Sequence, residues 1–306
     1  MAQEVNVRPV SRYVLATSIL TSLLVAPLEV VAQPDTSRLV VAPEIRWPRE
    51  TALAGSGLVM LGAARALEVN IRPVPPQGLD PAEIGWSVDR DRIGKIHQSA
   101  LTPSDVASAA SFAYPMILAF GMQPNGERMS GTLRRAAVYA EAYLLATGAA
   151  TLIKNSQDRP RPYTYVAQDQ RPDDSAYDVT VEEAFQSMPS THASTALCGA
   201  AFAITDHLLS RPQAPWLERC SVAFSGGLLA GLTTGYRVQA GKHFPSDVLA
   251  GGAIGLTSGV TLPLVHRYVS RSGVRAPGPP GRAWLQAFGA MVVGLGSGVL
   301  IAEASN

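Results

Sequence analysis

The side chains best suited to catalysis include a histidine and an aspartate four residues apart, His243 and Asp247. A carboxylate that accepts a hydrogen bond from one imidazole nitrogen leaves the other nitrogen free to act as a nucleophile. Arg237 precedes this pair and could hold an anion in front of it. Asp247 could instead serve only as the cap of the following helix, so the pair alone is a weak indication.

Two further groups of reactive or cationic side chains stand at predicted helix ends. Pro189-Ser190-Thr191-His192 opens an Ala-rich segment, and the free backbone N–H groups of a first helical turn bind anions. Lys154 ends a long apolar segment, and Arg161 follows it closely. Each group also has an ordinary structural explanation, because serine commonly caps helices and basic residues favour helix C-termini.

Together, the three groups supply what the transfer of a phosphoryl group requires: positive charge around its oxygens, a nucleophile and a proton donor. His243 could attack the phosphorus while His192 protonates the leaving oxygen. The phosphate would be held by cationic side chains and by donors at a helix start, namely Lys154, Arg161, Arg237, Ser190 and Thr191. The sequence shows no metal-ligand spacing, so we expect the cations to replace magnesium and expect no cofactor.

In their order and gaps, these groups resemble the three-part pattern of the type 2 phosphatidic acid phosphatase/haloperoxidase superfamily. The matching motifs lie between about Ala140 and Leu256 and read Lys154-x6-Arg161-Pro162, Pro189-Ser190-Thr191-His192 and Arg237-x5-His243-x3-Asp247. The resemblance implies a helical-bundle core, a phosphohistidine intermediate on His243 and orientation of His243 by Asp247. It also implies that His192 is the general acid and later the base, and that Lys154, Arg161, Ser190 and Arg237 hold the phosphate.

Two positions depart from the pattern of that superfamily. Thr191 stands where glycine is general, and Tyr236 stands where serine is frequent. The backbone N–H of Thr191 remains available, whereas Tyr236 removes a small hydroxyl from the phosphate site. The sequence Arg159-Pro160-Arg161-Pro162 contains two Arg-Pro pairs, and the spacing from Lys154 matches Arg161 to the arginine of the motif. Arg159 is then expected to lie outside the phosphate shell or in solvent.

The segments that must position these residues are apolar and rich in Ala, Leu and Gly, without the alternation typical of strands. We therefore predict an all-α bundle of about six core helices, with the active site at one end. The predicted helices are Thr51–Leu67, Pro103–Met122, Gly131–Lys154, Thr191–Leu209, Trp216–Tyr236, Ser246–Val269 and Ala283–Ala302.

The N-terminus has the layout of an export signal, with Arg8 and Arg12 before an apolar run and a possible cleavage after Ala32. An uncleaved anchor is the alternative, and both place the protein in a bacterial cell envelope. We divide the chain into a signal peptide or anchor (1–32), an N-terminal segment with a short apolar helix (33–102), a catalytic helical core (103–270), and a linker with a C-terminal apolar helix (271–306).

The placement of charge favours a membrane-embedded bundle over a soluble periplasmic one. The segments Gln123–Arg135, Arg211–Arg219 and His266–Arg282 are basic, whereas Asn155–Met188 is rich in acidic residues. This alternation follows the positive-inside tendency and predicts an active site on the outer, periplasmic side. If the charges are only solvated helix ends, the bundle would be soluble.

A few other ionisable residues have less definite interpretations. Glu141 could face the bundle interior as part of the pocket, and we expect Asp206 and His207 to form a surface pair. The two cysteines, Cys198 and Cys220, could form a disulfide or remain free thiols.

The sequence thus predicts a phosphatase that acts on a phosphate monoester or pyrophosphate, carried by a lipid or by a small molecule. A net charge of +1 gives no reason to expect nucleic acid. One alternative is a vanadium-dependent haloperoxidase, because vanadate adopts the phosphorane geometry in the same kind of pocket. The other is a non-catalytic envelope protein of the same fold, for which Thr191 and Tyr236 are the only sequence support.

Overall fold

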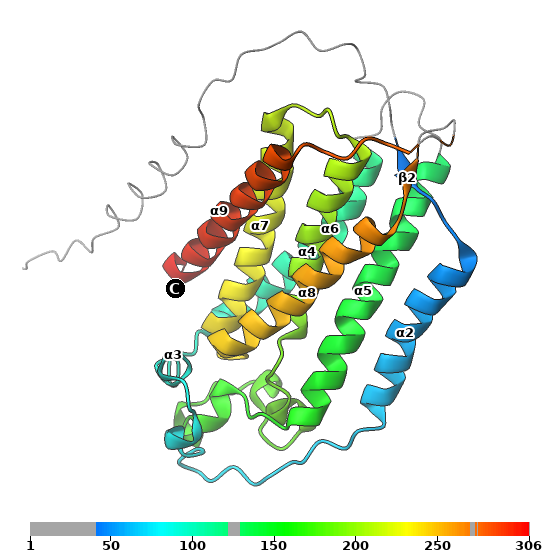
Figure 1. Cartoon of the computed structure of the whole chain (residues 1–306). Helices are drawn as coiled ribbons and strands as arrows, with labels where there is room; N and C mark the ends of the chain where they lie inside the picture. The colour runs from blue at the N-terminus through cyan, green and yellow to red at the C-terminus, as the bar shows by residue number, and fades with distance from the viewer. Residues whose placement is uncertain (1–40, 122–128, 270–272, 274, 306) are drawn as a thin grey trace, which may run out of the picture. The chain divides into compact units, whose positions relative to one another are not determined.

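The computed structural model describes residues 41–121, 129–269, 273 and 275–305, and these belong to one folded unit (Figure 1). The predicted signal peptide or anchor, residues 1–32, lies outside the described residues. Within the described residues the chain is a helical bundle with almost no strand, which confirms the predicted all-α class.

The helices and strands have the following bounds. The α-helices are α2 (Trp47–Arg65), α3 (Ser87–Arg90), α4 (Leu101–Gly121), α5 (Met129–Gln157), α6 (Thr191–Ser210), α7 (Trp216–Gln239), α8 (Pro245–Val265) and α9 (Gly281–Ala304). The 3-10 helices are η1 (Pro81–Glu83), η2 (Gln98–Ala100), η3 (Pro162–Tyr165), η4 (Gln168–Gln170), η5 (Ser175–Tyr177) and η6 (Glu182–Phe185). The strands β1 (Ala42–Pro43) and β2 (Tyr268–Val269) pair antiparallel.

The predicted helices are all present, with two ends displaced by four residues: α2 begins at Trp47 and not at Thr51, and α8 ends earlier than predicted. We expected that helix to continue to Val269, but it ends at Val265. Pro263 lies in its last turn, and the backbone becomes extended at His266. The next residues form β2, where the hydroxyl of the buried Tyr268 donates to Asp206 at 2.7 Å.

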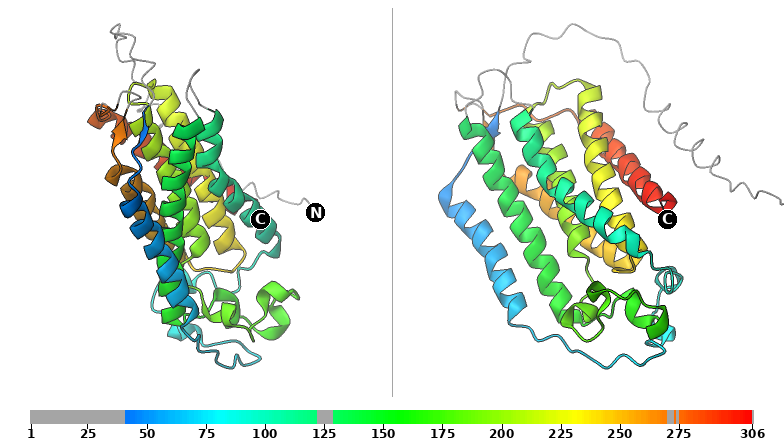
Figure 2. Two further views of the ribbon diagram at one scale, coloured as in Figure 1. Left: turned by 90° about the vertical axis from the view of Figure 1, so that its right-hand side faces the viewer. Right: turned by 180° about the vertical axis from the view of Figure 1, so that it is seen from behind.

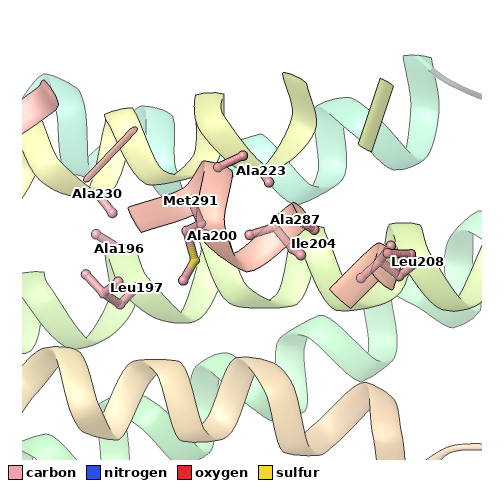
Figure 3. Packing of buried hydrophobic residues seen from close by; sticks show 11 residues of the cluster. Ala196, Leu197, Ala200, Ile204, Leu208, Ala223, Ala230, Ala287 and Met291 are labelled. Carbon is pink, nitrogen blue, oxygen red and sulfur yellow. The ribbon is translucent and has the colours of Figure 1, made fainter. Parts of the chain in front are cut away.

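Helix α6 lies in the middle of the bundle, in contact with α4, α5, α7 and α8, while α2 packs on α5 and α9 packs on α7 (Figures 1 and 2). One cluster of buried apolar side chains fills the space between α6, α7 and α9 (Figure 3). Ala196 and Ile204 of α6 meet Ala230 of α7 and Met291 of α9 in this cluster. Small side chains dominate it, so these helices approach closely.

The closest approach that positions the site is between α6 and α8. A Cβ atom at Gly251, Gly255 or Gly259 would lie 2.1, 1.9 or 2.4 Å from a carbonyl oxygen of α6 or its N-cap. These three glycines therefore let the two backbones touch. The contact brings the starts of both helices together, where the Ser190 N–H donates to the Asp247 carbonyl at 2.9 Å.

Three helical segments are long and apolar enough to cross a membrane: Met129–Tyr165, which includes α5, together with α8 and α9. Length and composition thus support an association with a membrane.

Two predictions outside the site can be compared with the structure. Asp206 and His207 are buried, so the prediction of a surface pair is wrong. The Asp206 carboxylate accepts from the Tyr268 hydroxyl and lies 3.5 Å from the Nε atom of Arg135. These two partners offset the cost of burying the Asp206 charge. Cys198 and Cys220 are both free thiols.

Candidate active site

The predicted site residues meet at one end of the bundle, at the bottom of Figure 1, where α5 and α7 end and α6 and α8 begin. Lys154 lies in the last turn of α5 and Arg237 in that of α7. Ser190 caps α6, whose first turn carries His192, and His243 lies in the short connection from α7 to α8. The glycine contact between α6 and α8 fixes the distance between the last two groups.

His243 is almost completely buried, with 1% of its surface exposed. Its Nδ1 atom lies 2.8 Å from the Ser187 carbonyl oxygen. Because a carbonyl can only accept, Nδ1 carries the proton, and Nε2 keeps its lone pair. Burial, with the positive charges of Arg161 and Lys154, holds the pKa of His243 well below its usual range. The imidazole is therefore neutral and can act as a nucleophile through Nε2.

Asp247 lies 3.8 Å from the His243 Nδ1, so the Ser187 carbonyl takes the place of the direct bond that the motif suggested. Its carboxylate instead accepts from the Ser187 hydroxyl at 2.6 Å and from the Phe244 N–H at 2.7 Å. It also accepts from Arg159 at 2.5 Å. Asp247 thus fixes the position of Ser187, and the Ser187 carbonyl accepts from His243. That Asp247 orients His243 stays a prediction.

Arg159 was expected to lie outside the phosphate shell or in solvent, and it lies beside Asp247. Its guanidinium joins Asp247 to Asp89 at 2.8 Å and to the Ser246 hydroxyl at 2.8 Å. The same guanidinium lies 4.9 Å from the centre of the Phe244 ring. Arg159 therefore cross-links α3 to the start of α8.

The three predicted phosphate-binding cations are all buried, each with 8% or less of its surface exposed. Lys154 makes no hydrogen bond or ion pair with any residue that the structure describes. The Nε of Arg237 is buried without a hydrogen-bond partner among the same residues. Arg161 donates to the Glu183 carbonyl at 2.7 Å and to the Lys242 carbonyl at 3.3 Å. Buried cations with unused donors indicate a site built for an anion.

His192 contacts Arg237 directly, with 2.6 Å between its Nε2 and a guanidinium nitrogen. Since a guanidinium can only donate, this nitrogen of His192 accepts and the ring is neutral. Burial, with the charges of Arg237 and Lys154, lowers the pKa of His192 to about 3. Asp105 pairs with the same guanidinium and lies 3.9 Å from His192.

The other predicted positions differ in what they offer an anion. The Ser190 side chain is fully buried and accepts from the Ala193 N–H at 3.3 Å, as a helix cap does. Thr191 is half-buried as the first residue of α6. The Tyr236 hydroxyl lies 3.4 Å from Ser305 and contacts none of the predicted phosphate ligands.

The sequence interpretation missed Lys242, a fourth buried cation. Its ammonium pairs with Glu183 at 3.3 Å, donates to the Ala176 carbonyl, and lies about 5 Å from the rings of Tyr163 and Tyr177. Burial and the nearby Arg161 lower the pKa of Lys242 to about 8. The one feature of the sequence that could have indicated a role for Lys242 is its position directly before His243. Glu183 and Asp105, both exposed, are the acidic counterparts of these cations.

An all-α bundle with buried cations and two neutral histidines gathered at its helix ends defines an anion-binding site equipped for nucleophilic and acid–base chemistry. Residues 135–271, which include every predicted site residue, match the model of the PAP2 superfamily, and this match supports the resemblance seen in the sequence. Members of the superfamily are usually phosphatases. No curated protein and no solved structure matches the chain.

Proposed function

We propose that the protein is a phosphatase that hydrolyses a phosphate monoester or pyrophosphate through a phosphohistidine on His243. The observation that carries this proposal is the state of His243: buried, neutral, with Nε2 available, among the charges of Lys154, Arg161 and Arg237. A neutral imidazole in a cationic pocket is matched to an electrophilic phosphorus whose oxygens are negative.

The proposed reaction has two displacements. When the phosphate binds, His192 takes up a proton. In the first displacement, Nε2 of His243 bonds to phosphorus, the bond from phosphorus to the ester oxygen breaks, and His192 gives this proton to that oxygen. In the second, His192 takes a proton from water, the resulting oxygen attacks phosphorus, and the P–N bond breaks to release phosphate. Each step leaves His192 ready for the next.

The cations bind the equatorial oxygens in both steps, and we assign this role to Lys154, Arg161 and Arg237, with Lys242 behind them. Their charge would repel a divalent cation, so the proposal gives the metal-like role to these side chains. Asp247 and Arg159 would act as positioning residues by holding Ser187 and the start of α8.

A lipid phosphate is the substrate class that we favour. The support is that three helical segments of the same chain are apolar enough to cross a membrane, which would hold the site near lipid headgroups. We further propose a place in the bacterial cell envelope with the site on the outer side, because the acid-rich segment 155–188 contributes to the site end.

The decisive variant is His243→Ala. We expect it to lower phosphate release by about a thousandfold or more, because the nucleophile is lost, while thermal unfolding stays close to that of the wild type. His97→Ala is the matched control, since His97 is half-buried and its side chain makes no hydrogen bond with the described residues. Full activity of His243→Ala would overturn the proposal.

The substrate is identified by a phosphate-release panel of phosphatidic acid, isoprenyl pyrophosphate, phosphatidylglycerol phosphate, a lipid A phosphate and a soluble monoester. The proposal expects release from at least one lipid substrate at a higher kcat/KM than from the soluble ester. Vanadate-dependent halide oxidation without phosphate release would instead identify a haloperoxidase. Inactivity in both assays would indicate a non-catalytic protein.

A further inference from the structure

Three buried ionisable side chains meet where the start of α2, the middle of α5 and the end of α8 come together. Glu50 comes from the first turn of α2, Glu141 from α5, and His266 from the end of α8. Each has no more than 6% of its surface exposed. One ligand atom from each lies within 4.8 Å of the others. None of the three takes part in the proposed phosphatase site.

The protonation of His266 follows from its contact with the backbone. Its Nδ1 lies 2.7 Å from the Leu262 carbonyl oxygen and therefore carries a proton, so in the neutral ring Nε2 presents a lone pair. That lone pair faces a carboxylate oxygen of Glu50 at 3.4 Å and one of Glu141 at 3.5 Å. Three acceptors facing one another repel unless something positive lies between them.

The two unsatisfied atoms strengthen this inference. Nε2 of His266 and Oε2 of Glu141 are buried and have no hydrogen-bond partner among the described residues. Leaving such atoms unpaired destabilises a fold, and native structures rarely do so without a reason. Glu50, in contrast, is held as a charged ligand would be, because Arg49 and the Arg46 N–H both donate to its carboxylate.

The separations suit metal ligands better than hydrogen-bond partners. Hydrogen bonds between nitrogen and oxygen are typically about 2.7–3.2 Å long, shorter than both contacts of Nε2. Ligand bonds of about 2.0–2.2 Å to a tetrahedral ion place neighbouring ligand atoms about 3.3–3.6 Å apart. The distances of 3.4 and 3.5 Å match that edge.

We propose that Glu50, Glu141 and His266 bind a divalent transition-metal ion, with Zn²⁺ the best fit to one imidazole nitrogen and two carboxylate oxygens. A cavity of about 770 Å³ is lined by both glutamates, so water or a small ligand can complete the coordination. The charge of the ion would be shared by Glu141 and by Glu50, which also pairs with Arg49. The site joins α2, α5 and α8 and therefore stabilises the bundle at the end remote from the histidines of the phosphatase site.

The test uses the purified full chain, stripped with a chelator and titrated with Zn²⁺ or Co²⁺. We expect binding that saturates at one ion per chain and a visible Co²⁺ absorption band of the tetrahedral type. The thermal unfolding midpoint should rise by about 5 °C with saturating Zn²⁺. Glu141→Gln and His266→Gln should each weaken binding by about a hundredfold or more and remove the thermal shift.

Two controls separate this site from other possibilities. Glu44→Gln changes a carboxylate that lines the same cavity but lies outside the cluster, and it should bind as the wild type does. His243→Ala should also bind normally, because that histidine lies at the other end. The proposal is overturned if the wild type binds no stoichiometric metal, or if Glu141→Gln binds equally well. The Co²⁺ spectrum of the wild type decides the matter even if a variant fails to fold.

Discussion

Two carboxylates pair with the cations of the proposed phosphate site. Asp105 pairs with Arg237, and Glu183 pairs with Arg161 and Lys242. Both carboxylates are more than half exposed, so each can leave its partner at small cost. Under the proposed function they would compete with the phosphate of a substrate for the same donors.

The variant Asp105→Asn should lower KM by about two- to fivefold, because an exposed ion pair is worth about 0.4–1 kcal/mol. The kcat should change little, since Asp105 leaves Arg237 when phosphate binds. Asp173→Asn removes an exposed acid of the segment 155–188 and serves as the control in the same steady-state assay. A raised KM in Asp105→Asn would show that the carboxylate assists binding instead.

The lowered pKa of His192 makes anion binding proton-linked. Burial and the charge of Arg237 depress this pKa to about 3, so the ring is neutral at about pH 6. A bound dianion offsets that charge and raises the pKa, so binding should take up protons. Sulfate is a suitable probe because it does not itself titrate near pH 6.

Calorimetry of sulfate binding in two buffers with different ionisation enthalpies measures this uptake. We expect a clear uptake in the wild type and almost none in His192→Gln. Equal uptake in both proteins would assign the proton to another group. The same linkage explains how a histidine with a lowered pKa can still serve as the acid once phosphate is bound.

At the residue level, the motifs predicted which side chains would meet but not how they are held. Lys154, Arg161, His192, Arg237 and His243 converge as their spacing suggested. The contacts of Ser187, Glu183 and Lys242 could not be predicted, because they depend on the path of the irregular segment from 158 to 190. That path is set by many weak interactions, and the segment has no periodic pattern of apolar residues from which its path could be predicted.

At the level of helices, the contact between α6 and α8 depends on three glycines of α8. Gly255 is the tightest, because a Cβ there would lie 1.9 Å from the Ser194 carbonyl oxygen. Gly252 faces only the side chain of Leu197, at 3.6 Å from its Cγ. An alanine should therefore be poorly tolerated at Gly255 and well tolerated at Gly252, although both positions lie on the same helix.

Gly255→Ala should destabilise the protein by about 1–3 kcal/mol and lower kcat, because α8 must move away from α6 and takes the start of the helix with it. Gly252→Ala should be neutral or slightly stabilising, since alanine favours a helix and its Cβ has room. Thermal unfolding in detergent and phosphate release measure both effects. Equal tolerance of the two variants would mean that the helices can separate without cost to the site.

The helices themselves were predictable because their apolar runs are long and their capping residues clear. The end of α8 was not, since the pairing of β1 with β2 joins residues more than 200 positions apart. Large separations along the sequence also explain why the sequence showed no metal-ligand spacing. Glu50, Glu141 and His266 become neighbours only when α2, α5 and α8 pack together.

At the level of the whole molecule, the proposed orientation in a membrane can be measured. With Cys198 and Cys220 replaced by alanine, Asp173→Cys and Arg282→Cys place single thiols at exposed positions in the acid-rich and basic segments. An impermeant maleimide should label Asp173→Cys in intact cells and Arg282→Cys only after permeabilisation. The opposite pattern would reverse the orientation, and equal labelling in intact cells would favour a soluble envelope protein.

The glycine contact between α6 and α8 also restricts the route by which a substrate enters. Because the two backbones touch from Ser190 to Cys198, nothing can pass between these helices to reach His243. The exposed groups beside the site include Asp105, Glu183 and the partly exposed His192, so we expect the phosphate to arrive from their side. The part of a substrate left outside then lies next to two negative charges. The entrance should therefore select neutral or zwitterionic headgroups over those that carry additional anionic groups.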